Sequence, residues 1–125
     1  MPKRVVITGM GIYSCLGKNL AEVKDSLFEG KSGIVSDPLR EELGYKSPLT
    51  GNVEEPDLKS FLTRRQRISM GQPAKFAYMA TKEAVENAGL DIDFLNKNTT
   101  GIIYGNDSTA QAVIEGVDKM RAKKD

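Results

Sequence analysis

The sequence contains no histidine, no tryptophan and a single cysteine, Cys15, in 125 residues. Without histidine, these residues cannot supply a Ser-His-Asp triad, a Cys-His pair or a histidine-ligated metal. One cysteine excludes a disulfide framework and a zinc site built on several thiolates. A large part of common catalytic chemistry is therefore absent, and we expect neither a metal site nor a cofactor.

An excess of charge of one sign is also missing, because 18 Lys and Arg residues balance 17 Asp and Glu residues, for a formal net charge of +1. Nucleic-acid-binding domains usually carry a basic excess, so we expect no nucleic-acid partner. The N-terminal apolar run, Val5–Ile7, ends at Thr8 and Gly9. No run approaches the roughly 20 residues of a membrane span or the apolar core of a signal peptide. We therefore expect a cytoplasmic protein with no membrane partner.

Short apolar runs indicate strands. Residues 3–8 predict a strand, because the β-branched run Val5–Ile7 is continuous, as in a strand buried on both faces of a parallel sheet. Residues 101–105 predict a second buried strand. A third strand is expected near residues 49–53, within a stretch (residues 32–56) whose glycines and prolines otherwise predict irregular structure.

Four segments have the apolar spacing or the capping signals of helices, namely residues 19–29, 57–62, 72–88 and 110–124. Asn19 is a good N-cap residue and Glu22 completes a pattern similar to a capping box. Alanines recur at helical spacing in the third of these helices. We expect this helix to approach a neighbour closely and to be deeply buried.

The order strand, helix, irregular segment, helix, strand, helix is typical of the α/β class. Two buried strands are too few for a complete doubly wound sheet, and a further strand is expected after the last helix. The sequence therefore predicts that residues 1–125 are the N-terminal segment of a larger α/β enzyme, with an incomplete sheet of their own.

A glycine pair follows the first predicted strand, at Gly9 and Gly11, and suggests a dinucleotide-binding turn. That fingerprint requires a third glycine at position 14, where this sequence has Ser14. No strand ending in an acidic residue follows at the spacing needed to hold a ribose. The simpler interpretation is that the glycines allow a tight turn in a packed core.

Five short blocks then occur in one order over nearly the whole chain: TGMGI at 8–12, GKSGI at 30–34, GNV at 51–53, EAVENAGL at 83–90 and GIIYG at 101–105. Together they resemble the β-ketoacyl-[acyl-carrier-protein] synthases, and most closely the type I branch. The resemblance implies the thiolase fold, in which two similar α/β halves form α-β-α-β-α layers. It also implies a homodimer.

The activity implied by the resemblance is a decarboxylative Claisen condensation in fatty-acid biosynthesis. A cysteine thiolate would take the acyl chain from acyl carrier protein, and two histidines would assist decarboxylation of the malonyl thioester. None of these three residues lies in residues 1–125, and Cys15 does not match the nucleophile. We expect Cys15 to be a small buried apolar residue, and we expect this chain alone to be inactive.

Arg64, Arg65 and Arg67 form a basic cluster at the junction of two predicted helices. On composition alone, such a cluster is most often a solvated, ion-paired face. The resemblance implies instead that Arg64 and Arg65 dock the acidic acyl carrier protein, while Arg67 lies one residue from the family's third basic position. A second basic patch is expected at the last basic residues, Arg121, Lys123 and Lys124.

The segment GNDSTA at 105–110 is richer in glycine in the family. The resemblance implies that this segment lines or gates the acyl pocket, with Ser108 at the gating position beside Asp107. The polar substitutions leave the preference for acyl chain length open and are compatible with an unusual acyl substrate. A simpler interpretation is that Asp107 or Ser108 caps the helix that follows, and both can hold.

Three interpretations remain open at this point. The chain is part of a catalytic synthase, part of a non-catalytic subunit of the chain-length-factor kind, or a stand-alone module that binds carrier protein. The missing strands argue against the third interpretation, because an isolated module of this pattern would expose large apolar patches.

Overall fold

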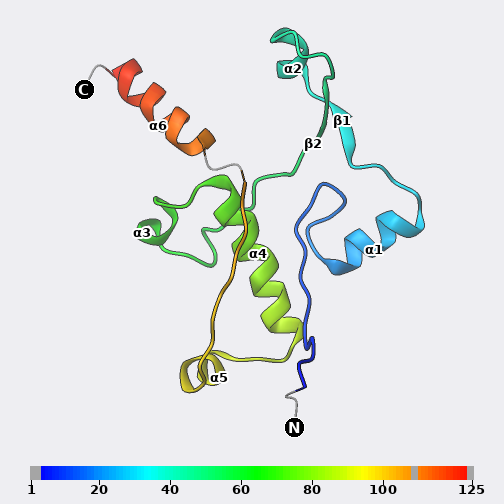
Figure 1. Ribbon diagram of the computed structural model, residues 1–125, viewed down its shortest axis with the longest axis vertical. Helices are drawn as coiled ribbons and strands as arrows, with labels where there is room; N and C mark the ends of the chain where they lie inside the picture. Colours follow the sequence, from blue (N-terminus) through cyan, green and yellow to red (C-terminus); the bar gives the residue numbers. More distant parts are fainter. Residues whose placement is uncertain (1–3, 108–109, 124–125) are drawn as a thin grey trace.

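An antiparallel hairpin forms the regular sheet of the computed structural model, which describes residues 4–107 and 110–123 (Figure 1). Strand β1 (Ile34–Ser36) pairs with strand β2 (Leu49–Gly51), and Val35 lies opposite Thr50. The expected strand at 49–53 is confirmed for its first three residues. The prediction that residues 32–56 are otherwise irregular is wrong, because β1 and a short helix, α2 (Pro38–Glu42), both lie within this stretch.

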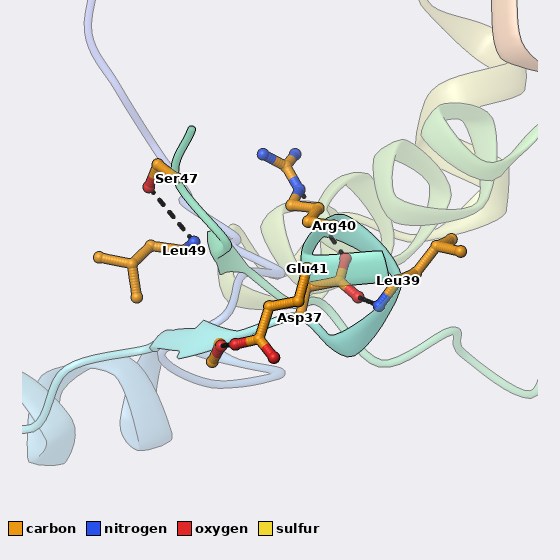
Figure 2. A network of polar contacts seen from close by, with 7 residues as sticks. Asp37, Leu39, Arg40, Glu41, Ser47 and Leu49 are labelled. Atoms are coloured by element: carbon orange, nitrogen blue, oxygen red, sulfur yellow. Dashed lines mark hydrogen bonds and ion pairs between the residues drawn. The ribbon is translucent and has the colours of Figure 1, made fainter. Parts of the chain in front are cut away.

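Polar side chains hold the tip of this hairpin together, as Figure 2 shows. The Asp37 carboxylate accepts a 3.0 Å hydrogen bond from the backbone N–H of Leu39 and so caps α2. The hydroxyl of Ser36 donates to the Glu41 carboxylate at 2.5 Å. Arg40 makes a 3.8 Å ion pair with Asp37. These contacts pair polar groups that stay near the surface, because the hairpin is too small to bury them.

The other helices are α1 (Leu20–Phe28), α3 (Arg64–Arg67), α4 (Gln72–Asn87), α5 (Ile92–Lys97) and α6 (Ala110–Lys123). The predicted helices at 19–29, 72–88 and 110–124 are thereby confirmed within the described residues. The predicted helix at 57–62 is wrong, because Leu58 accepts hydrogen bonds from Phe61 and Leu62 in a single turn that does not continue. Neither α3 nor α5 was predicted from the sequence.

The boundaries of α1 follow from the residues that flank it. Asn19 Oδ1 accepts a 2.9 Å hydrogen bond from the backbone N–H of Glu22, as an N-cap residue should. The Glu22 carboxylate in turn accepts the backbone N–H of Lys18 at 2.8 Å. After the helix, Gly30 adopts a φ of 66°, a left-handed conformation that glycine reaches at little cost.

The strands expected at residues 3–8 and 101–105 are wrong for the described residues, which form no ladder there. Residues 98–107 run as a long connection from α5 to α6 (Figure 1). An extended segment becomes a strand only when a neighbouring backbone exchanges hydrogen bonds with it. Neither segment has such a neighbour among the described residues, and their apolar side chains are exposed, with Ile7 at 85% and Ile103 at 101%.

The N-terminal segment instead lies along α4. A Cβ atom added at Gly11 would come within 2.0 Å of the Ala80 carbonyl oxygen, and one at Gly9 within 2.3 Å of the Ala84 carbonyl oxygen. The glycines therefore allow close approach to a helix rather than a tight turn. The alanines of α4 do face a close neighbour, but α4 has no buried residue, so the expected deep burial is wrong.

Little of the molecule is buried overall. The chain exposes 10644 Å² of surface. A folded monomer of 13.7 kDa exposes roughly 6,600 Å² on the usual scaling of surface with mass. Among the described residues, the buried apolar side chains are Val23 and Leu58, at 7% and 3% exposure. The structure is thus a partial α/β arrangement of helices with a small sheet. Within its described part, no helix combines the length and apolar character needed to cross a membrane.

Candidate functional site

Helix α3 carries three arginines, Arg64, Arg65 and Arg67, within four residues. Thr63 begins the helix with a capping box, in which its hydroxyl accepts the backbone N–H of Gln66 and the Gln66 side chain accepts the backbone N–H of Thr63. The cap is uncharged, and the first turn holds no acidic residue. The positive charge of the arginines is therefore not neutralised within their own helix.

Arg64 and Arg67 lie one helical turn apart and face a recess of about 380 Å³. Arg65 does not line this recess. Leu58, which also lines the recess, is one of the few buried side chains. The remaining lining residues come from the segment before α3, from the residue after it and from the first turn of α4: Glu55, Pro56, Asp57, Lys59, Ile68 and Lys75.

Both carboxylates of this recess already have partners. Glu55 forms an ion pair with Lys75, whose side chain is 25% exposed. The Asp57 carboxylate accepts a 2.9 Å hydrogen bond from the backbone N–H of Lys59. The charged ends of Lys59 and of the two α3 arginines form no ion pair within residues 4–107 and 110–123.

The Arg67 side chain is held in place. Its Nε donates a 3.1 Å hydrogen bond to the carbonyl oxygen of Leu62, and the residue is half-buried. This bond uses one of the five guanidinium donors and fixes the plane of the group. The terminal amino groups of Arg67 therefore keep their hydrogen-bonding capacity for a ligand or partner.

A second recess, of about 600 Å³, lies between residues 13–22, the segment 54–57 and α4. Lys18 at its rim forms a 2.7 Å ion pair with Glu54, and this hydrogen bond raises the pKa of Lys18 above its ordinary value. Burial raises the pKa of Tyr13, whose ring stacks on Phe76 with centroids 5.7 Å apart. No group of residues able to hold a metal ion occurs in the described part of the chain.

Cys15 is half-buried, which corrects the expectation of full burial. A Cβ atom added at Gly33 would lie 2.7 Å from the Cys15 sulfur, and one added at Gly51 would lie 3.2 Å from it. The thiol therefore packs against the two ends of the hairpin. With no histidine in the chain to act as a base, the surroundings of Cys15 are those of a packing residue.

Three further residues singled out in the sequence, Asp107, Arg121 and Lys123, lie on or beside α6. Asp107 is exposed and lies in a bend before this helix, while Lys123 is exposed at its end. Arg121 lies 3.9 Å from Asp118 in an ion pair. Ser108 and Lys124 fall outside the described residues. The structure thus brings Arg64 and Arg67 to one recess, whereas Lys123 lies on α6 and Asp107 in the connection before it.

Lys59 and Lys75 are neighbours of the arginines that could not be recognised from the sequence. Lys75 belongs to the first turn of α4 and Lys59 to the turn that was expected to be a helix. The available signal was the proline at the start of α4, two residues before Lys75. That signal predicts the helix start but not which face of the helix the lysine occupies.

Residues 2–125 match the family described as "Beta-ketoacyl synthase, N-terminal domain". The chain therefore belongs to this family, and the resemblance predicted from the five sequence blocks is confirmed.

Individual relatives agree with the family match. The chain is 38% identical over 103 residues to 3-oxoacyl-[acyl-carrier-protein] synthase 1 of Haemophilus influenzae, a match covering 82% of this chain and 25% of the relative. It is 33% identical over 124 residues to the Escherichia coli K12 protein of the same name, covering 98% and 30%. It is 28% identical over 121 residues to the tetracenomycin polyketide synthase ketoacyl synthase alpha subunit of Streptomyces glaucescens, covering 97% and 28%. The chain thus spans 25–30% of the length of these relatives.

Proposed function

We propose that residues 1–125 are the N-terminal segment of a 3-oxoacyl-[acyl-carrier-protein] synthase that acts in fatty-acid biosynthesis. The observation that carries this proposal is the family match over residues 2–125. Relatives named as 3-oxoacyl-[acyl-carrier-protein] synthases support it, because their similarity extends over 82–98% of this chain.

The proposed reaction joins an acyl thioester to a malonyl thioester. The malonyl group loses CO₂, and the electron pair of the broken C–C bond becomes an enolate. The enolate attacks the carbonyl carbon of an acyl-cysteine thioester, a new C–C bond forms, and the cysteine leaves as a thiolate. The chain has no histidine, and Cys15 packs against glycines, so the proposed catalytic cysteine and two histidines belong to other parts of the protein.

The large exposed surface supports a role as part of a longer polypeptide. The excess over a folded monomer of this mass is roughly 4,000 Å² on the usual scaling. Apolar side chains at Val5, Ile7 and Ile103 contribute to it. We propose that residues 3–8 and 101–105 join the sheet of a thiolase-like domain with α-β-α-β-α layers, and that the complete protein is a homodimer.

For this chain we propose two binding roles and no catalytic one. Arg64, Arg65 and Arg67, with Lys123 and Lys124, would attract the acidic acyl carrier protein. Their charges need no global excess to do so, because local patches steer an acidic partner even at a net charge of +1. Asp107 and Ser108 would lie beside the acyl chain.

The proposal is tested by assaying the complete gene product for condensation of acyl- and malonyl-carrier protein, with residues 1–125 alone as the comparison. We expect a 3-oxoacyl product from the complete protein and none from residues 1–125. A second candidate function is part of a non-catalytic subunit, which stays open because residues 1–125 contain neither a histidine nor a cysteine placed as a nucleophile. A complete protein that forms no product alone, but restores product formation when mixed with a partner subunit, would establish the second candidate.

A further inference from the structure

The recess beside α3 has an unbalanced charge. Four cationic side chains line it, from Lys59, Arg64, Arg67 and Lys75, against two carboxylates, from Glu55 and Asp57. The two carboxylates are already engaged, one by an ion pair with Lys75 and one by a backbone N–H. An excess of two positive charges therefore faces a space large enough for a small molecule.

Two features favour a defined ligand over loosely held counter-ions. Arg64 and Arg67 are presented from one face of one helix, at a spacing of three residues. The Leu62 carbonyl oxygen fixes the Arg67 guanidinium, so that less conformational entropy is lost when a ligand binds. Planar guanidinium groups hold two oxygen atoms of one anion in parallel hydrogen bonds.

We propose that this recess binds the phosphate group of a small phosphate monoester. At neutral pH a phosphate monoester carries about −1.5 to −2 charges, which matches the excess of two, whereas a carboxylate carries only one. The apolar lining from Pro56, Leu58 and Ile68 offers contacts for the carbon chain of the ester. The recess of about 380 Å³ has room for that chain as well as the phosphate.

This inference stands on the recess and does not depend on the condensation reaction. The phosphate site and the docking of carrier protein also require different arginines. A surface that attracts an acidic protein uses Arg64, Arg65 and Arg67 alike, whereas the recess uses only Arg64 and Arg67. Arg65 is therefore a matched control with the same charge in the same helix.

The test is a titration of the complete protein with ethyl phosphate, inorganic phosphate and chloride at constant ionic strength, followed by calorimetry. We expect ethyl phosphate to bind more tightly than inorganic phosphate, and chloride to give no saturable signal. The Arg64→Ala change should weaken ethyl phosphate binding by at least about tenfold, as expected for a lost charge-assisted hydrogen bond. The Arg65→Ala change should leave binding within about twofold, as expected for an exposed charge outside the site.

Because Arg67 also bonds to the backbone, its removal could disturb the fold. Arg67→Lys keeps the charge and removes the planar fork, and we expect it to weaken ethyl phosphate binding while the circular dichroism spectrum stays unchanged. Equal losses in the Arg64 and Arg65 variants would overturn the proposal, since they would indicate a diffuse positive field. Binding of inorganic phosphate as tight as that of ethyl phosphate would overturn the assignment to an ester. Carrier-protein affinity is measured separately, so failure of one proposal leaves the other intact.

Discussion

The carboxylate of Glu83 on α4 accepts the backbone N–H of Leu20, the first residue of α1, at 2.7 Å. Its second oxygen accepts the backbone N–H of Ile12 at 2.9 Å. A single half-buried side chain thus satisfies two backbone donors that lie 63 and 71 residues earlier in the sequence. Glu83 of α4 therefore holds the loop before α1 at two points, in addition to the bond from the Met10 backbone N–H to Asn87.

The first prediction concerns this contact. Glu83→Gln removes the negative charge and leaves only one acceptor oxygen, so one of the two N–H groups loses its partner. We expect the free energy of unfolding of the complete protein to fall by about 1–3 kcal/mol, the usual cost of losing a charge-assisted hydrogen bond. Amide hydrogen exchange at Ile12 and Leu20 should become faster, which denaturation and exchange experiments together can measure.

Glu86→Gln is the matched control for that experiment. Glu86 lies on the same helix and pairs with Lys82 at the surface, with its side chain 62% exposed. An exposed ion pair contributes little, so we expect a change of about 0.5 kcal/mol or less. A loss as large as that of Glu83→Gln would show that the charge of α4, rather than the contact with the loop, determines stability.

The second prediction concerns the close approach of the N-terminal segment to α4. Gly11→Ala would place a methyl group against the backbone oxygen of Ala80, where neither side can yield easily. We expect a loss of about 1–3 kcal/mol in the free energy of unfolding, as for other overpacked contacts. An unchanged free energy of unfolding for Gly11→Ala would contradict this close contact.

The third prediction concerns alkaline pH. The folded protein raises the pKa of Tyr13, through burial, and that of Lys18, through its hydrogen bond to Glu54. Both groups hold their protons more tightly in the folded state than in the unfolded state. Their contribution to stability is therefore fully present below pH values near 10 and is lost as the pH rises through the raised pKa values.

Thermal melting of the complete protein between pH 8 and 11 can measure this loss. Tyr13→Phe removes one of the two titrating groups and keeps the stacking on Phe76. We expect the melting temperature of this variant to fall less steeply above pH 10 than that of the unchanged protein. The same slope in both proteins would contradict the contribution of Tyr13.

The fourth prediction concerns docking of the carrier protein. Single alanine substitutions of Arg64, Arg65 and Arg67 should each weaken carrier binding about two- to fivefold, the range for exposed charge pairs. Added salt should reduce the affinity of the unchanged protein and shrink these differences. Surface plasmon resonance at two salt concentrations measures both effects.

Lys97→Ala provides the control for the docking experiment. Lys97 lies on α5, which follows the other end of α4 from α3, and its side chain is 75% exposed (Figure 1). The substitution removes the same charge away from the proposed surface. Equal weakening by Lys97→Ala would indicate attraction by net charge instead of docking on α3.

Much of the helical structure could be predicted from the sequence because its signals are local. Asn19 and Gly30 flank α1, and Gly89 follows α4 in a left-handed conformation with a φ of 67°. Caps and glycines act within one turn of the helix end, so they are visible without knowing the fold.

The strands were not predictable in the same way. The apolar runs at Val5–Ile7 and Ile102–Tyr104 carry the composition of buried strands, yet neither segment pairs with another in the described residues. Strand formation depends on a partner that is remote in sequence or absent from the chain. Short β1 and α2 were missed because three- and five-residue elements leave almost no periodic pattern.

The candidate site was predictable in part. The clustering of Arg64, Arg65 and Arg67 is visible in the sequence, but their division between a recess and open surface is not. That division depends on the direction in which each side chain leaves the four-residue helix α3. It also depends on the path of the chain from α3 to α4, which places Lys75 at the same recess.

The hairpin of β1, α2 and β2 satisfies its polar groups from within, since every contact drawn in Figure 2 joins residues of the hairpin to one another. Gly44, in the turn after α2, has nothing within 4 Å of its Cβ position. Extra residues inserted after the exposed Lys46 would lie beyond this turn, and would leave the contact between the N-terminal segment and α4 unchanged. The hairpin is thus the natural place in this chain for a fluorescent label or an epitope tag.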